Sequence, residues 1–306
     1  MYEHDERIVM TLDAGGTNFV FSAIQGCREI VEPICLPAAS DDLERCLSVL
    51  VEGFLEVEKR LPKLPVAISF AFPGPADYEH GIIGDLPNFP AFRGGVALGP
   101  YLREQFGIPV MVERSSYESH PLGRTEWMKL YAVLLGKEDV AEKAFKEQTD
   151  KLDKVLTSDD KDTGKTVAFF YINSTGSVNV RKNGDYVSNM IELAGGKYVP
   201  EDTGESDNAL STMNMQMEEF YAKAKDADYI IYNSTIDGEL SSIDELLAKS
   251  NLLADFKAVK DGNVWCTGKN LFQETTELGT MIEDIHTILT TDDDSLDELV
   301  YMHKLK

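Results

Sequence analysis

The chain has 306 residues, of which 43% are hydrophobic and 27% charged, a composition typical of a folded protein long enough for two compact domains. Its formal net charge of −24 opposes binding to nucleic-acid phosphates and to anionic membrane surfaces. It contains no run of about 20 apolar residues that would span a bilayer. The N-terminal residues lack a basic segment followed by an apolar one. We therefore expect an acidic protein in the cytoplasm, with no nucleic-acid partner and no membrane span.

The first third of the chain is predicted to alternate strands with helices. Its β-branched and apolar residues recur at strand spacing in some segments and at helix spacing in others. The expected elements are a strand, tight glycine turn and strand over 7–24, a helix over 41–60, a strand over 65–72, a short helix over 101–106 and a strand over 108–112.

Beyond Glu113 the pattern changes to long helices followed by further strands. Pro121 suits the first position of a helix. The expected helices cover 121–135, 140–156, 186–193, 217–224, 243–249 and 276–289, and the expected strands cover 166–172, 229–233 and 263–266. This alternation predicts an α/β architecture.

The four cysteines do not form a metal-binding pattern. Cys27, Cys35 and Cys46 lie in the first third and Cys266 lies alone near the end, with no CxxC spacing and no histidine at a ligand interval. We expect reduced, structural thiols and no bound metal.

A glycine turn between the first two strands has the composition of a phosphate-binding loop. Gly15 and Gly16 allow the backbone to approach a ligand with its N–H groups facing phosphate oxygens. Thr17 adds a hydroxyl, and Asp13 has the chemistry to hold a hydrated Mg²⁺. A glycine turn alone would equally fit an ordinary hairpin.

The segments LDAGGTN, VAISFAFPGPAD and LPNFPAF give this turn a specific context, because together they resemble the ROK family of sugar kinases, in particular its glucokinase-like members. The similarity covers residues 7 to about 113 and implies an actin-like ATPase fold. It implies a phosphate-binding motif formed by Asp13, Gly15, Gly16, Thr17 and Asn18. It further implies sugar contacts by Gly74 and Asn88, and Mg-ATP as the cofactor if the chain acts as a kinase.

The sequence departs from this family immediately after the 108–112 segment. The family has an Asn-Asp pair there, whose aspartate takes the proton from the sugar hydroxyl, whereas this chain reads Val112-Glu113-Arg114. The loss of a general base costs about 10²–10⁴-fold in rate. The family's second half, with its zinc cluster and adenosine-binding glycines, is also replaced. We therefore predict no catalytic residue and no kinase activity; any turnover would be that of a ROK-type sugar kinase.

The rear of the chain carries a second resemblance. SHPLGRTEWMKLYAVLLGKEDVAEKAF, VAFFYINSTGSVNVRKNGDYVSNMIELAGGKYV, MQMEEFYAKAKDADYIIYNS and NVWCTGKNLFQ are similar to the linking helix and second lobe of class III solute-binding proteins of ABC importers. The similarity covers residues 117–306. It implies a siderophore, haem or cobalamin type of ligand, docking on an ABC permease, and a family that normally works outside the cytoplasm.

Several residues of this rear part are candidates for recognition. Tyr171, Arg181 and Tyr186 lie near a strand-to-helix loop, where α/β sheets present ligand contacts, and an arginine with two tyrosines suits an anionic, partly aromatic iron chelate. A surface ion pair and half-buried tyrosines would explain the same residues equally well. By resemblance, Glu218 matches the acidic residue that docks on the importer, although it also suits a helix N-terminus.

The two tryptophans, Trp127 and Trp265, are predicted to be core residues rather than ligand platforms.

The predicted fold is therefore α/β with two lobes, an actin-like-ATPase-type N-terminal half-domain and a Rossmann-like C-terminal lobe joined by a long helix. The predicted boundaries are 1–113 for the kinase-like domain, 114–157 for the joint and linking helices, and 158–306 for the solute-binding lobe. Three functions remain open: ligand binding of the iron-chelate class at the lobe junction, an ATP-dependent hexose kinase, and an artificial chimera with no selected function. The partner is a small molecule, either a sugar or an iron chelate.

Overall fold

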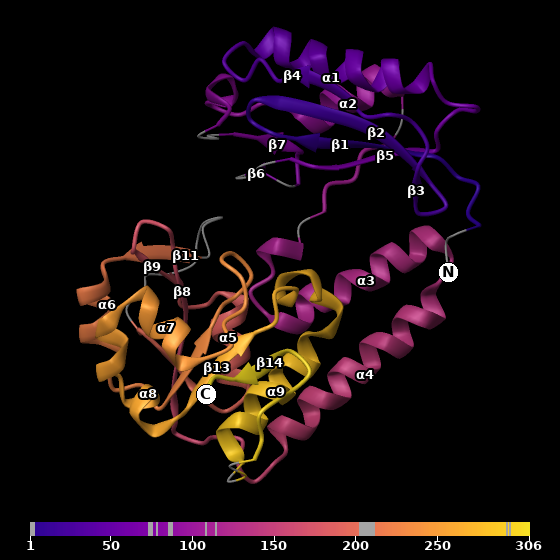
Figure 1. Cartoon of the computed structure of the whole chain (residues 1–306). Helices are drawn as coiled ribbons and strands as arrows, with labels where there is room; N and C mark the ends of the chain where they lie inside the picture. Colours follow the sequence, from indigo (N-terminus) through magenta and orange to yellow (C-terminus); the bar gives the residue numbers. More distant parts are fainter. Residues whose placement is uncertain are drawn as a thin grey trace. The chain divides into compact units, whose positions relative to one another are not determined.

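The computed structural model describes residues 4–72, 76–77, 79–84, 88–107, 109–113, 115–201, 212–291, 293 and 295–306. The chain divides into two compact units, Met1–Arg114 and Ser115–Lys306, coloured from indigo to magenta and from magenta to yellow in Figure 1. Each unit has its own sheet, and the two are described separately below.

The first unit is built on a sheet with the strand order β3-β2-β1-β5, in which β4 also pairs with β2. Strands β1 and β2 form an antiparallel hairpin, and β5 lies parallel to β1 on its other side. The elements are β1 (Val9–Ala14), β2 (Asn18–Gln25), β3 (Arg28–Glu29), β4 (Ile34–Pro37), α1 (Leu43–Glu58), β5 (Ala67–Ala71), β6 (Ala76–Asp77), β7 (Ile82–Ile83) and α2 (Leu98–Phe106).

Aromatic packing holds α1 against this sheet. The Asp42 side chain caps the helix by accepting the Arg45 N–H, which satisfies one of the free amides of the first turn. Along the helix, Phe54 meets Phe21 of β2 edge-to-face with ring centroids 5.1 Å apart. Gly53 allows this approach, since a Cβ on it would lie 2.3 Å from the Phe21 ring.

Residues 109–112, the described part of the strand expected over 108–112, do not form a strand, so this prediction was wrong for them. Residues 109–113 have no strand assignment. Pro109 has no N–H to donate to a sheet, and Met111 is 51% exposed, so the described part of the segment lacks both the hydrogen bonding and the burial of a central strand.

The second unit contains a mixed sheet with the strand order β11-β9-β8-β12-β13-β14, in which β10 also pairs with β8. Strands β8, β10, β12 and β13 run parallel, while β9, β11 and β14 are antiparallel to their neighbours. The strands are β8 (Thr166–Ile172), β9 (Val178–Arg181), β10 (Lys197–Val199), β11 (Thr212–Met215), β12 (Tyr229–Tyr232), β13 (Val264–Thr267) and β14 (Met302–Lys304). The helices are α3 (Pro121–Leu135), α4 (Glu138–Leu156), α5 (Tyr186–Leu193), α6 (Met217–Ala224), α7 (Ile243–Lys249), α8 (Lys257–Asp261) and α9 (Leu278–Thr290).

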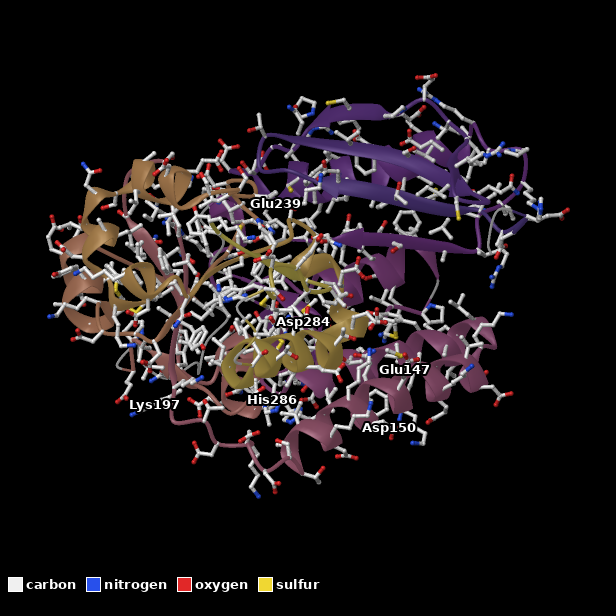
Figure 2. All side chains as sticks on the ribbon, turned by 60° about the horizontal axis from the view of Figure 1, so that its bottom comes forward. Glu147, Asp150, Lys197, Glu239, Asp284 and His286 are labelled. Atoms are coloured by element: carbon white, nitrogen blue, oxygen red, sulfur yellow. The ribbon has the colours of Figure 1, made fainter. Side chains whose placement is uncertain are left out.

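Helices α3 and α4 form an antiparallel pair linked at Gly136, whose φ of 61° ends α3 in the left-handed conformation. One face of α4 is charged and exposed, as Glu147 and Asp150 show (Figure 2). The opposite face turns inward at Gln148, which is 1% exposed. Its side-chain oxygen accepts the Thr280 N–H at 3.0 Å, and this hydrogen bond joins α4 to the first turn of α9.

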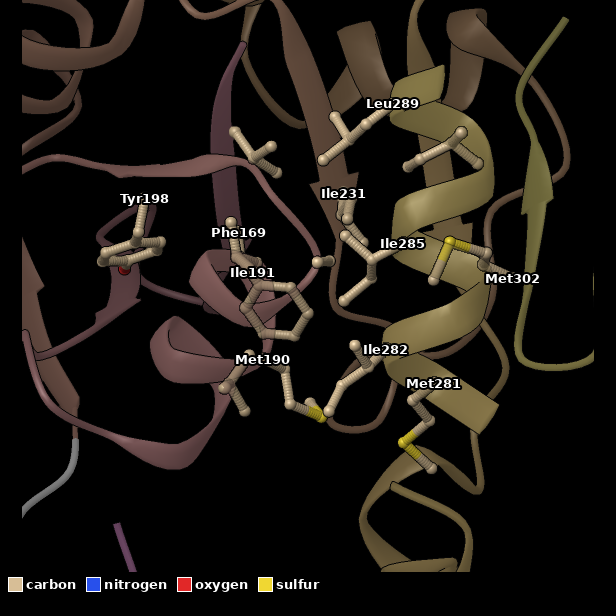
Figure 3. Close-up of a cluster of buried hydrophobic side chains, with 14 of the residues drawn as sticks. Phe169, Met190, Ile191, Tyr198, Ile231, Met281, Ile282, Ile285, Leu289 and Met302 are labelled. Carbon is tan, nitrogen blue, oxygen red and sulfur yellow. The ribbon is translucent and has the colours of Figure 1, made fainter. Parts of the chain in front are cut away.

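Alternate residues of β8 face two separate cores, as the two-residue period of a strand requires. Val167 and Phe169 belong to the core beneath α4, α5 and α9, whereas Ala168 and Phe170 belong to the core beneath α6, α7 and α8. Figure 3 shows the first of these cores, with Ile282 and other α9 side chains directed toward Phe169 and the residues of α5. Both faces of the sheet are covered, so the predicted α/β fold class is confirmed.

Among the described residues, no helix combines the length and apolar character needed to cross a membrane.

Candidate functional site

The predicted phosphate loop lies at the turn between β1 and β2. Gly15 and Gly16 are half-buried, while Asp13, Thr17 and Asn18 are exposed. A Cβ on Gly16 would lie 2.9 Å from the Cβ of Asn88, so only a glycine allows this close approach.

The structure therefore brings Asn88, predicted to contact a sugar, against the predicted phosphate loop. The next residue, Phe89, is fully buried and stacks on Phe19 of β2 with ring centroids 6.0 Å apart. This packing fixes the position of Asn88 beside Gly16. The other predicted sugar contact, Gly74, lies outside the described residues. Glu113, the carboxylate next to the position of the missing base, is half-buried.

In the second unit, Arg181 and Tyr186 are brought together by the turn between β9 and α5. The Arg181 guanidinium carbon lies 5.5 Å from the centroid of the Tyr186 ring and 4.8 Å from that of Phe272. Its Nε lies 3.2 Å from the Asp185 carboxylate, and these two side chains are 10% and 2% exposed. Asp185 also caps α5 by accepting the Val187 N–H at 3.0 Å. A buried ion pair thus fixes the helix that begins with Tyr186.

Arg124 of α3 completes this group. Its guanidinium carbon lies 3.7 Å from the Tyr186 ring centroid, and it donates to the carbonyl oxygens of Ser116 and Glu118. Burial raises the pKa of Tyr186, and the two guanidinium groups oppose that rise. We call Arg124, Arg181, Asp185, Tyr186 and Phe272 the arginine–aromatic cluster.

Arg124 was not among the residues predicted from the sequence. A cation in the first turn of a helix is opposed by the helix dipole, so an arginine three residues after Pro121 is unfavourable unless other contacts hold it there. An arginine this close to the N-terminus of a predicted helix could therefore have indicated, from the sequence alone, that Arg124 is a candidate site residue.

The remaining predicted residues lie elsewhere in the second unit. Tyr171 is half-buried and packs against the core on the α6–α8 side, whereas Tyr186 belongs to the other core. Glu218 is exposed in the first turn of α6. Trp265 is a core residue, as predicted, but Trp127 is only half-buried, so the core prediction was wrong for it.

Across the part of the chain that the structure describes, no three histidine, cysteine, aspartate or glutamate side chains gather as metal ligands. The exposed Cys27 and Cys35 and the buried Cys46 and Cys266 are free thiols. Burial raises the pKa of Cys46 and of Cys266 to about 11, which keeps these two thiols protonated near neutral pH.

The periplasmic binding protein family matches residues 98–271, which is more than half of the chain. The chain therefore belongs to that family. The periplasmic heme-binding protein HutB of Vibrio cholerae is similar in structure, with 17% identity, a TM-score of 0.54 and coverage of 79% of this chain and 80% of that one. At this identity the likeness concerns the fold.

An uncharacterized lipoprotein of Methanocaldococcus jannaschii is 31% identical over 189 residues, which are 61% of this chain and 43% of that protein. The chain thus spans less than half the length of this curated relative.

A glucokinase from Parabacteroides distasonis is 47% identical, with a TM-score of 0.38 and coverage of 60% of this chain and 47% of that one. The chain is thus similar to members of both families, and the two resemblances predicted from the sequence are confirmed.

Proposed function

We propose that the chain binds an anionic, partly aromatic small molecule of the iron-chelate class through the arginine–aromatic cluster of its second unit. The observation that carries this proposal is the placement of two guanidinium groups, those of Arg124 and Arg181, within 5.5 Å of the Tyr186 ring. Guanidinium groups stack on aromatic faces and make charge-assisted hydrogen bonds to oxyanions. The family to which the chain belongs supports ligand binding in general.

The two arginines have different tasks in this proposal. Arg181 is 8% exposed and its charge faces Asp185, so it positions Tyr186. Arg124 is half-buried and lies closer to the ring, so it is the residue that meets the ligand. Tyr171 remains a proposed contact, although it packs toward the other core.

Glu218 is a proposed docking residue for an ABC permease. Its carboxylate is exposed in the first turn of α6, beside the exposed Glu219, so this helix end is available to a basic partner surface. Work outside the cytoplasm would follow from such docking, and cell fractionation would distinguish it from the cytoplasmic location predicted from the sequence.

A hexose kinase is the second candidate, because Asn88 lies against Gly16 of the phosphate loop. The loop fits phosphate groups, and Mg-ATP held by Asp13 and Thr17 would supply the transferable phosphoryl group. The chain lacks an aspartate after Val112 to take the proton of the sugar, and the periplasmic binding protein family matches residues 98–271, where a kinase would have its second half. We therefore propose that it does not phosphorylate sugars.

Titration of the full chain with haem, cobalamin and a ferric catecholate, followed by tryptophan fluorescence, tests the binding proposal. Because one lobe encloses only part of a ligand, we expect a dissociation constant of about 1 mM, or roughly 4 kcal/mol, for the catecholate. Arg124→Gln should weaken it several-fold. Lys129→Gln, an identical loss of charge further along α3, is the matched control and should leave binding unchanged.

No change in tryptophan fluorescence with any of the three chelates would refute the proposal and favour a chimera without selected function. Micromolar binding that is unaffected by Arg124→Gln and by the conservative Arg181→Lys would refute the proposed site. Arg181→Lys is preferred to Arg181→Ala, because removal of one partner of a buried ion pair costs about 3–5 kcal/mol and would unfold part of the unit.

A further inference from the structure

A shallow hollow of about 320 Å³ lies on α3, outside the arginine–aromatic cluster. It is lined by Glu118, Gly123, Glu126, Trp127 and Leu130. Positions 123, 127 and 130 follow the helical repeat, so they share one face of α3, and Glu118 reaches this face from the segment before the helix. None of the candidate functions described above uses these residues.

Specific contacts build the hollow. The Trp127 Nε1–H donates to one carboxylate oxygen of Glu118 at 3.2 Å, which orients the indole. A Cβ on Gly123 would lie 3.2 Å from the other oxygen of the same carboxylate. Glycine destabilises a helix interior, and here its missing side chain leaves room for the Glu118 carboxylate and the hollow.

The charges around the hollow favour a cation. Glu118 and Glu126 contribute two carboxylates to its lining. Two cations lie nearby but are not among the residues that line the hollow. The Arg124 guanidinium lies 3.7 Å from the Tyr186 ring and donates to the main-chain oxygen of Glu118, and the Lys129 ammonium lies 4.0 Å from the Phe145 ring. Lys129 also lies 3.3 Å from Glu126, but that surface pair is weak. The net charge of −24 adds a general attraction for cations.

We propose that this hollow is a binding site for a small quaternary ammonium compound. A tetraalkylammonium group has no N–H to satisfy and is attracted to the face of an indole and to nearby carboxylates. The apolar contribution of Leu130 and Gly123 suits its alkyl groups. Mg²⁺ or Ca²⁺ is a poorer fit, because these ions require six or more oxygen ligands at 2.0–2.6 Å, whereas one Glu118 oxygen already accepts the hydrogen bond from Trp127.

Ligand-observed NMR of the full chain at constant ionic strength tests this site, with choline and its uncharged isostere 3,3-dimethylbutan-1-ol as probes. We expect millimolar binding of choline and about 10-fold weaker binding of the alcohol. Glu118→Gln keeps an acceptor for the Trp127 N–H but removes the charge, and should weaken choline binding at least about 3-fold. Gly123→Met should fill the hollow and abolish binding. Glu147→Gln, an equal charge change on exposed α4, is the control (Figure 2).

Three results would overturn the proposal: equal binding of choline and the alcohol, unchanged choline binding in both Glu118→Gln and Gly123→Met, or no saturable binding below about 100 mM choline. The fluorescence of Trp265, which is 3% exposed, verifies that each variant is folded. If Gly123→Met is unfolded, Trp127→Leu removes the aromatic face instead and should likewise abolish binding.

Discussion

Replacement of Asp284 by asparagine should change how the stability of the second unit depends on pH. Asp284 lies on α9 (Figure 2). Its exposed fraction is 5%. Its carboxylate accepts the Tyr301 N–H at 2.8 Å and so ties the chain before β14 to α9. Burial raises its pKa from 3.8 to about 6, a rise that Glu283 supports and Lys151 opposes.

The sign and size of the effect follow from this pKa. Between pH 4 and 6 the folded state holds a proton that the unfolded state has released, so stability falls as the pH rises through this window. A rise of about two pKa units corresponds to a loss of roughly 3 kcal/mol above pH 6, as an upper value. Asparagine carries no charge and keeps an acceptor for Tyr301. We expect Asp284→Asn to be about 1–2 kcal/mol more stable than the wild type at pH 7.5. This gain is smaller than the upper value, because the asparagine side chain reproduces the hydrogen bonds of the carboxylate only in part.

Urea unfolding followed by tryptophan fluorescence measures this difference, because Trp127 and Trp265 both lie in the second unit and report on it alone. The gain should fall by roughly 2 kcal/mol between pH 7.5 and pH 4, because at pH 4 the folded wild-type carboxyl is protonated and the unfolded one is about half protonated, so the variant is then no more stable than the wild type. Glu147→Gln, which removes an exposed carboxylate of α4, is the control and should retain the wild-type slope. A constant difference between Asp284→Asn and the wild type from pH 4 to pH 7.5 would refute the reasoning.

Three further predictions concern packing and catalysis. Gln148→Ala leaves the buried Thr280 N–H without its acceptor and should destabilise the second unit by about 2 kcal/mol in the same urea assay. An unchanged urea midpoint would show that this hydrogen bond does not stabilise the contact between α4 and α9. Gly53→Ala places a Cβ against the Phe21 ring and should lower the free energy of unfolding of the first unit by about 1–3 kcal/mol, measured by urea unfolding followed by far-UV circular dichroism. A coupled assay with glucose and Mg-ATP should detect no phosphorylation; turnover that disappears in Asp13→Ala would contradict this.

The helices and the central strands of the second unit could be predicted from the sequence because hydrophobic periodicity dominates them. The strand Thr166–Ile172 and the helix Pro121–Leu135 occur as predicted. The short edge strands, such as β10 and β14, were missed because three residues carry no readable period and are defined only by their partners. The strand over 108–112 was predicted from its apolar residues, but an apolar run does not form a strand when no neighbouring strand pairs with it.

The site residues could be predicted by type but not by environment. Arg181 and Tyr186 do lie together, yet the sequence could not show that Asp185 pairs with Arg181 in the interior. Arg124 reaches Tyr186 across 62 positions of sequence, a tertiary contact that no local pattern encodes. The Gly16–Asn88 approach is of the same kind, since 72 positions separate the two residues.

Hydrogen exchange of the full chain, measured by mass spectrometry with and without a ferric catecholate and in parallel with Mg-ATP plus glucose, tests most directly whether the chain is a binding protein rather than a kinase. The account predicts that the catecholate slows exchange at the start of α5, near Tyr186 and Arg181, and that Mg-ATP with glucose leaves the turn from Asp13 to Asn18 unchanged. Slower exchange in that turn, with no change in α5 under the catecholate, would contradict it.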